Sequence, residues 1–192
     1  MKSIDESIAT KKLLKSNVDD IAQMSELIVE SLRSGGKLLL FGNGGSAADA
    51  QHIAAEFIGR YLIQRRALPA IALTTNTSSL TAIANDYGYD HVFERQIEAL
   101  CEDNDVAVGI STSGNSKNVM LGIEAAMKKN AKTIGMTGRR GGKLSRIVDL
   151  AIKVPSDSTP RIQESHILIG HIVSEIVEIS FSDKPTSMRK RS

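Results

Sequence analysis

Hydrophobic and polar residues follow two periods along this chain, one typical of helices and one typical of short buried strands. In residues 3–34 the apolar positions, among them Ile21, Met24 and Ile28, recur at spacings of three and four, which predicts helix, in two segments, up to Gly35. Beyond that point, short apolar runs alternate with amphipathic segments. The expected strands are Lys37–Phe41, Pro69–Leu73, Val106–Ile110, Thr133–Met136 and Leu150–Val154, and the expected helices are Ser46–Tyr61, Ser78–Asn85, His91–Cys101, Ser116–Lys129 and Ile162–Phe181.

Short apolar strands that alternate with helices are typical of a parallel sheet covered on both faces. Right-handed crossovers then build an α/β fold of three layers, a five-stranded sheet between two layers of helices. The chain shows no internal repeat and no linker that would divide it. We therefore expect a single structural domain, in which the helices of residues 1–34 pack on residues 35–181, followed by a tail of residues 182–192.

The basic charge of the chain is concentrated in that tail. The chain has 24 basic and 22 acidic residues, a net charge of +2, and residues 182–192 hold four of the basic residues and one acid. The other residues, 20 basic and 21 acidic, carry a net charge of −1. We expect the tail to be disordered in solvent rather than to form a basic binding face. With 4% aromatic residues and no Trp, a base-stacking surface for nucleic acid is not expected either.

The cysteine content and the hydropathy of the chain indicate the cellular compartment in which the protein works. Cys101 is the single cysteine of the chain, which excludes an internal disulfide and fits a reducing environment. No apolar run approaches the ~18 residues of a membrane span, and the charged opening residues do not resemble a signal peptide. We expect a cytoplasmic protein with no membrane partner.

The first candidate functional segment is the glycine-rich loop between the first expected strand and its helix. Residues 42–47 read Gly-Asn-Gly-Gly-Ser-Ala and match the G-x-G-x-x-A form of the dinucleotide-binding loop. Dinucleotide binding also needs a carboxylate after the second strand, where residues 74–77 offer only Thr and Asn. The other interpretations are a plain tight turn and a close approach of the backbone to an anionic or polyhydroxy ligand.

The second candidate segment follows the third expected strand. Residues 111–116 read Ser-Thr-Ser-Gly-Asn-Ser, so several hydroxyl groups lie at a helix N-terminus, where backbone N–H groups and the helix dipole favour an anion. The segment has neither the Lys of a nucleotide-triphosphate loop nor the G-x-S-x-G of a hydrolase. Besides ordinary N-capping by Ser116, this pattern favours binding of a phosphate monoester.

The third candidate is a pair on the helix that follows the glycine-rich loop. His52 and Glu56 are four residues apart, which places them on one face of the helix. Such a pair suits two ligands of one metal ion or an acid–base pair. An ordinary ion pair on a solvated face has the same spacing.

The closing helix, expected over Ile162–Phe181, is apolar on nearly all sides and should be buried in the core or between subunits. Two of its polar residues, Gln163 and His171, then need partners. They lie ~12 Å apart along the helix axis, so a small site that used both would need long reach or two copies of the chain. We interpret His91 and His166 as structural.

In their order and spacing, these motifs resemble the phosphoheptose isomerases of the sugar isomerase (SIS) domain family over nearly the whole chain. The matching motifs are residues 42–46, His52 with Glu56, Asn85-Asp86, residues 111–116, and Arg161–Glu164 through His171. The resemblance implies a flavodoxin-like sheet, a homotetramer with active sites between subunits, and one zinc ion per subunit. The implied reaction converts sedoheptulose 7-phosphate to D-glycero-D-manno-heptose 7-phosphate, the first step toward the ADP-heptose of lipopolysaccharide and related surface glycans.

The resemblance also implies roles for individual residues. Glu56 would be the base and His171 the acid in proton transfer through an enediolate. A carboxylate that binds a metal is a weaker base, so Glu56 can act as base, as ligand, or as each in turn. The zinc ligands would be His52, Glu56, Gln163 and His171. The sugar phosphate would contact Asn43, Gly44, Gly45, Glu56, Asn85, Asp86, Ser111, Thr112, Ser113, Ser116 and Gln163.

One alternative belongs to a different functional class. A protein with the same fold and similar loops is not an enzyme and binds the replication initiator DnaA. In that protein the positions that match Glu56 and His171 lack the carboxylate and the imidazole. Both groups are present here, which favours the isomerase.

Overall fold

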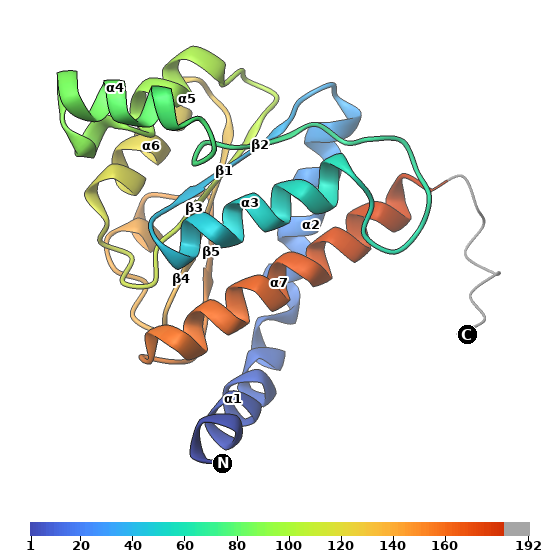
Figure 1. The fold of residues 1–192 in the computed structure, drawn as a ribbon. Helices are drawn as coiled ribbons and strands as arrows, with labels where there is room; N and C mark the ends of the chain where they lie inside the picture. The colour runs from blue at the N-terminus through green and yellow to red at the C-terminus, as the bar shows by residue number, and fades with distance from the viewer. Residues whose placement is uncertain (183–192) are drawn as a thin grey trace.

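The computed structural model of the chain describes residues 1–182 (Figure 1). Its helices are α1 (Lys2–Leu13), α2 (Val18–Arg33), α3 (Gly45–Ile58), α4 (Thr77–Tyr87), α5 (Glu94–Leu100), α6 (Lys117–Lys128) and α7 (Thr159–Ser180), with the short 3-10 turns η1 (Leu14–Asn17), η2 (Tyr89–His91) and η3 (Leu144–Arg146). Its strands are β1 (Leu38–Gly42), β2 (Ala70–Ala72), β3 (Val106–Ile110), β4 (Lys132–Thr137) and β5 (Leu150–Lys153). The tail expected over residues 182–192 lies outside the described residues, except for Ser182.

The five strands form one parallel sheet in the order β2-β1-β3-β4-β5. This is the doubly wound order of a flavodoxin-like fold, and it confirms the expected α/β class. The register runs from Leu38 opposite Val106 to Gly42 opposite Ile110, so β1 and β3 end together. The carboxyl ends of the two central strands therefore open at the same edge of the sheet.

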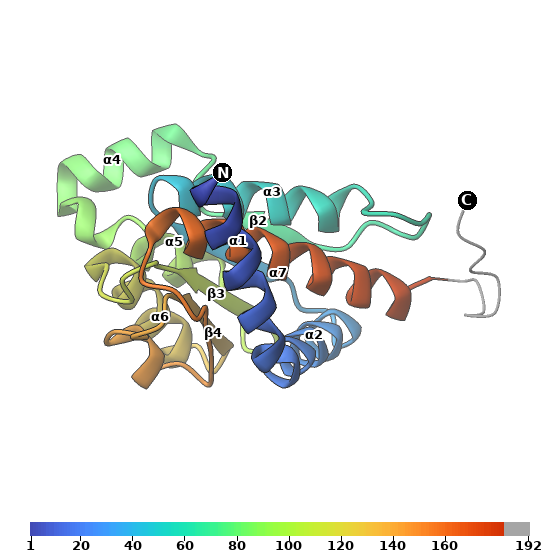
Figure 2. The same cartoon turned by 90° about the horizontal axis from the view of Figure 1, so that it is seen from below.

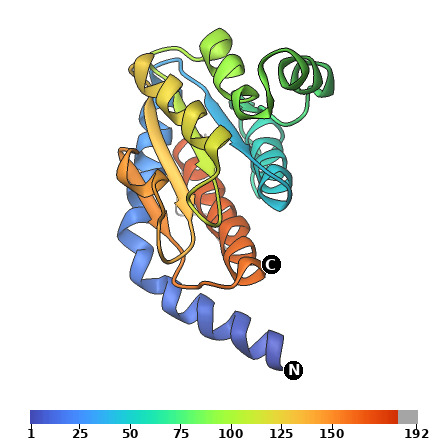
Figure 3. The same ribbon diagram turned by 90° about the vertical axis from the view of Figure 1, so that its left-hand side faces the viewer.

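Two hydrophobic clusters fill the space on the two faces of the sheet. One face is covered by α2, α3 and α7, and its cluster includes Ile28, Ile53 and Val173. The other face is covered by α5 and α6, with Phe41 and Phe93 in its cluster. Figure 3 shows α7 and α6 on opposite sides of the strands. This arrangement is the expected three-layer sandwich.

The first helix reaches away from this body. Viewed from below, α1 crosses the N-terminal end of α7 (Figure 2). Ser7 donates a hydrogen bond to Glu164 over 2.7 Å, and Arg161 donates to the backbone oxygen of Ser3 over 2.8 Å. These polar contacts hold α1 on the closing helix, while α2 packs on the sheet.

Most elements have the expected positions, but α3 ends at Ile58 rather than at Tyr61. Beyond Ile58 the helical hydrogen bonds are replaced. The backbone oxygen of Phe57 accepts the N–H of Leu68 over 3.1 Å, and the N–H of Tyr61 donates to the carboxylate of Glu178 over 2.8 Å. These long-range partners stop the helix where the local pattern continues it.

No helix within residues 1–182 combines the length and the apolar character that crossing a membrane requires.

Candidate active site

The two loops singled out in the sequence lie on either side of the switch point of the sheet. From β1 the chain moves outward to β2 and then returns to β3 on the other side of β1. Ligands of doubly wound sheets bind in the crevice at such a point, beyond the carboxyl ends of the strands. The glycine-rich loop follows β1 and the hydroxyl segment follows β3. The topology thus brings both candidate loops to one crevice.

A pair of amides links these two sides of the crevice. The side chains of Asn43 and Asn118 donate to each other over 2.8 Å in both directions. Asn118 is buried and its oxygen also accepts the N–H of Val119 over 2.9 Å. The hydroxyl of Tyr89 donates to Asn43 over 3.3 Å. Asn43 is therefore held in one orientation by groups from α6 and η2.

The glycine-rich loop has the tight form that its sequence indicates. Gly44 precedes α3 with φ 57°, a backbone conformation that favours glycine. As a glycine, it offers no side chain to cap the helix. Gly45 lies against the side chain of Gln163, whose Nε2 would be 2.3 Å from a Cβ at that position. A side chain at position 45 would force the amide of Gln163 to move away.

The hydroxyl segment forms a compact turn before α6. The Oγ atoms of Ser111 and Ser116 lie 2.9 Å apart, and Ser116 precedes the helix without a side-chain cap bond. Its hydroxyl is therefore not used for the capping that was the alternative interpretation. Gly114 has φ 65°, and a Cβ there would lie 2.0 Å from the backbone oxygen of Gly141. The glycine-rich turn after β4 thus supports the hydroxyl segment directly.

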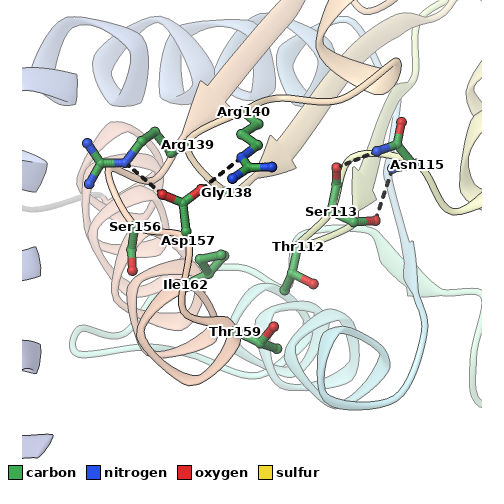
Figure 4. A pocket seen from close by; sticks show the side chains of 10 residues that line it. All are labelled: Thr112, Ser113, Asn115, Gly138, Arg139, Arg140, Ser156, Asp157, Thr159 and Ile162. Atoms are coloured by element: carbon green, nitrogen blue, oxygen red, sulfur yellow. Dashed lines mark hydrogen bonds and ion pairs between the residues drawn. The ribbon is translucent and has the colours of Figure 1, made fainter.

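A cavity of about 370 Å³ opens beside this segment (Figure 4). Thr112 and Ser113 line one side, and Arg139 and Arg140 extend over it from the end of β4. Both guanidinium groups pair with Asp157, at 3.4 and 3.3 Å. The cavity therefore offers hydroxyls, backbone N–H groups and cations near the carboxyl ends of β3, β4 and β5, an environment suited to a phosphorylated, polyhydroxy ligand.

A second centre lies where α3 packs on α7. Nε2 of His52 is 3.1 Å from Oε1 of Glu56 and 3.2 Å from Nε2 of His171. The donor atoms of these three residues all lie within 4.8 Å of one another. Two imidazoles and a carboxylate at this spacing form a donor set typical of catalytic zinc sites. The structure thus unites three of the four residues for which the resemblance implies metal binding.

Gln163 does not lie at this cluster in the single chain. It contacts Gly45 at the start of α3, seven residues before His52, or about 10 Å along the helix. Asp49 lies between the two positions along α3, and burial raises its pKa to about 6, while the nearby His52 partly opposes the rise. Gln163 and His171 thus contact different parts of α3, as expected from the ~12 Å between them along α7.

The remaining candidate residues have local partners. Asn85 donates to the carboxylate of Asp86 over 2.9 Å, on the exposed side of α4. His91 pairs with Glu94. His166 is fully buried, its Nε2 lies 3.3 Å from the backbone oxygen of Thr137, and burial lowers its pKa to about 4. The structural interpretation of the last two agrees with these contacts.

Several residues of the site were missed in the sequence. Arg139 and Arg140 follow the fourth strand after one residue, Gly138, and their position after a parallel strand is a signal that could have identified them. Asn118 and Tyr61 carry no such signal. Asn118 is one polar residue in a helix, and Tyr61 reaches His171 only through the packing of α3 on α7, with ring centroids 5.4 Å apart.

Comparison with known proteins agrees with this architecture. The family model described as SIS domain matches residues 5–138. A phosphoheptose isomerase of Geobacter sulfurreducens is 60% identical over 158 residues, 82% of this chain and 84% of the relative. The structure of phosphoheptose isomerase from Neisseria gonorrhoeae has a TM-score of 0.88 and 46% identity, over 93% of this chain and 96% of that one. A phosphoheptose isomerase from Francisella tularensis has a TM-score of 0.90 and 36% identity, over 93% and 95% of the two chains. The chain belongs to the SIS domain family and, within it, to the phosphoheptose isomerases.

Proposed function

We propose that this protein converts sedoheptulose 7-phosphate to D-glycero-D-manno-heptose 7-phosphate. The observation that carries the proposal is the convergence of His52, Glu56 and His171, from two helices of a phosphoheptose isomerase fold, within 4.8 Å. An aldose–ketose isomerase must move a proton between adjacent carbons while the carbonyl changes place, which requires a base, an acid and stabilisation of an enediolate. This cluster contains groups of each kind.

The hydroxyl segment would anchor the phosphate. Ser111, Thr112, Ser113 and Ser116 precede the N-terminal end of α6, where hydroxyl and backbone N–H donors can bind a dianion. The glycine-rich loop, with Asn43, Gly44 and Gly45, would contact the sugar across the crevice, and Asn85, Asp86 and Gln163 would complete the sugar contacts.

The acid–base work would fall to Glu56 and His171. Glu56 is partly buried beside His52, so its carboxylate is held by a contact yet remains open to a substrate on the solvent side. We assign Glu56 the removal of the proton from carbon and His171 the protonation of the sugar oxygens. A carboxylate that holds a metal is a weaker base, so Glu56 would act as base only while it is not a ligand.

The same cluster would hold zinc. His52, Glu56 and His171 supply two imidazole nitrogens and a carboxylate oxygen, which fit the metal. Zinc, when bound, polarises the oxygens of the sugar. Because Gln163 of the same chain lies against Gly45, we assign the fourth ligand to Gln163 of a second copy.

That assignment requires an oligomer, and one face of the chain suits it. An apolar groove of about 250 Å³ runs between η1, α2 and α7, lined mainly by Leu14, Val18, Ile21, Leu168, Ile172 and Ile176. We propose that it is covered in a homotetramer with active sites between subunits. The heptose product would supply ADP-heptose for lipopolysaccharide or related glycans, and the enzyme would work in the cytoplasm.

The direct experiment is to incubate the purified, zinc-loaded protein with sedoheptulose 7-phosphate and to identify the product. We expect D-glycero-D-manno-heptose 7-phosphate, with solvent deuterium incorporated at the carbon that receives the proton. No aldose product at any metal content would refute the proposal. A pull-down with DnaA tests the alternative, which uses neither Glu56 nor His171 and for which we expect no binding.

A further inference from the structure

A buried ion pair outside the catalytic cluster joins α7 to the loop that follows α3. The side chains of Glu178 and Arg65 are 1% and 2% exposed, and Oε1 of Glu178 lies 3.6 Å from Nε of Arg65. A charged pair removed from water is costly unless hydrogen bonds satisfy its atoms. The other hydrogen bonds of Glu178 and Arg65 therefore show what the pair does in the fold.

The carboxylate of Glu178 binds three successive backbone N–H groups. Oε1 accepts from Tyr61 over 2.8 Å, and Oε2 accepts from Leu62 over 2.6 Å and from Ile63 over 2.9 Å. Residues 61–63, a short distance beyond the end of α3, are thus bound to α7. No regular secondary structure holds residues 59–69, so these bonds define the path of the chain there.

The guanidinium of Arg65 binds the end of α3 itself. It donates to the backbone oxygen of Glu56 over 2.6 Å, to that of Gly59 over 3.1 Å and to that of Arg66 over 2.9 Å. The last carbonyls of a helix lack partners within the helix, and a cation there is favourable. Burial lowers the pKa of Arg65, and the charge of Glu178 counteracts the change. Arg65 therefore fixes the backbone of Glu56.

The loop held by Glu178 also contacts His171, through the side chain of Tyr61. The Tyr61 ring stacks on the imidazole, with centroids 5.4 Å apart and planes at 24°. On α7, His171 and Glu178 are seven residues apart, two turns along one face. Glu178 thus holds the backbone of Tyr61 while the ring of Tyr61 covers His171. Burial, then Glu175, Glu56 and Glu178, raise the pKa of Tyr61, so its phenol is neutral near pH 7.

We propose that Glu178 and Arg65 are positioning residues for the catalytic cluster, with Tyr61 as the side chain that orients His171. Arg65 sets the position of Glu56 through its backbone oxygen, and Glu178 sets that of His171 through Tyr61. The functional roles of Glu56 and His171 rest on the proposed function, but the positioning does not. If Tyr61 did not orient His171, replacing its ring would leave the cluster unchanged, and if Glu178 did not hold the loop, replacing its carboxylate would.

The first test uses metal-free protein and does not depend on the reaction. A stacked aromatic ring shifts the NMR resonances of the imidazole protons, so the His171 signals report the contact. They are read at about pH 8.5, well above the ordinary histidine pKa of ~6.5. We expect the shift to persist in Tyr61→Phe and to be lost in Tyr61→Leu.

Glu178→Gln tests the contact between the carboxylate of Glu178 and the loop after α3. The amide nitrogen would face the N–H groups of Leu62 or Ile63, donor against donor, so the loop should detach and the His171 signals should move. Glu124→Gln is the matched control, because it makes the same change at an exposed residue of α6, on the other face of the sheet, and should leave the signals in place. If Glu178→Gln does not fold, the two Tyr61 variants decide the proposal.

The second test measures Zn²⁺ affinity against a chelating dye, together with isomerase kinetics. Residues that orient a metal ligand typically contribute about 10–100-fold to affinity or activity, and we expect a loss of this size in Tyr61→Leu, seen in Zn²⁺ affinity and kcat rather than in KM. Tyr61→Phe should restore both. Unchanged His171 signals in Tyr61→Leu, or wild-type Zn²⁺ affinity and kcat, would overturn the proposal. A wild-type protein that did not isomerise the sugar would refute the proposed function alone, since the NMR and Zn²⁺ measurements still test the positioning.

Discussion

At the scale of single residues, the spacing along one helix predicts only part of the catalytic cluster. The spacing of His52 and Glu56 already placed both on one face of a helix. That His171 joins them depends on the closeness of α3 and α7. A Cβ at Gly170 would lie 2.6 Å from Cδ1 of Ile53, so the glycine allows the two helices to approach. The spacing along either helix alone carries no information about this contact.

The role of Glu56 can be tested by Glu56→Gln. Glutamine keeps the volume and one oxygen but does not accept a proton near neutral pH. We expect kcat to fall by about 10²–10⁴, the usual contribution of a positioned base, in a protein that still folds and binds substrate. Zinc content is measured alongside the kinetics, because loss of the metal would have the same effect.

The contrary outcome is equally specific. If Glu56 only formed an ion pair with His52, whose side chain is 50% exposed, its loss would change stability by at most ~1 kcal/mol and leave turnover intact. A variant with wild-type kcat and full zinc content would show that Glu56 is not the base.

His166 gives the protein a predictable pH dependence of stability. Its pKa is about 4 in the fold and ~6.5 in an unfolded chain. The unfolded state therefore binds a proton first, and stability is lost as pH falls from ~6.5 toward 4. Between pH 7 and pH 5 this contribution amounts to about 2 kcal/mol.

His166→Leu removes the titrating group and isolates this effect. Urea unfolding at pH 7 and at pH 5, at one protein concentration and without metal, should show a smaller loss of stability at pH 5 in His166→Leu than in the wild type. Asp49 and the other titrating groups are common to both proteins and cancel in the comparison. An equal loss in the two proteins would contradict a buried, neutral His166.

At the scale of elements, the order of strands and helices followed from the pattern because each apolar run was short and each helix was bounded by glycine or polar residues. β3 has the expected bounds, Val106–Ile110. The predicted end of α3 was wrong because the carboxylate that stops the helix, that of Glu178, lies more than 100 residues away in the sequence. Likewise, the loops after β1 and β3 could be placed together from parallel topology, whereas the Asn43–Asn118 pair could not.

The segment before α6 can be tested with the double variant Ser111→Ala, Ser113→Ala. Each hydrogen bond to a charged phosphate contributes about 1.5–3 kcal/mol, so we expect KM to rise by about tenfold or more per lost bond. The fold should survive, because the two hydroxyls make one contact each, Ser111 with Ser116 over 2.9 Å and Ser113 with the exposed N–H of Asn115 over 3.1 Å, and each bond contributes about 1 kcal/mol. An unchanged KM would move the phosphate site away from this segment.

At the scale of the whole molecule, the apolar closing helix was expected to be buried, and the single chain buries only part of it. Ile169, Val173 and Val177 lie in the core, whereas Ile176 is 37% exposed and lines the groove with Leu168 and Ile172. Sequence pattern does not separate residues that face the core from residues that face a second copy, because both are apolar. A contiguous apolar strip on the surface is typical of an interface.

Ile176→Lys tests whether this groove is covered by another subunit. A charge placed in an apolar interface must be desolvated, so we expect sedimentation velocity at micromolar concentration to show smaller species than the wild-type oligomer. Because the fourth zinc ligand is assigned to Gln163 of a second copy, zinc affinity and kcat should fall in parallel with assembly. Met127→Lys is the control, since Met127 is an exposed apolar residue of α6, outside the groove. A wild type that sediments as a monomer with full activity would exclude a shared site, and so would an Ile176→Lys monomer that keeps both zinc and turnover.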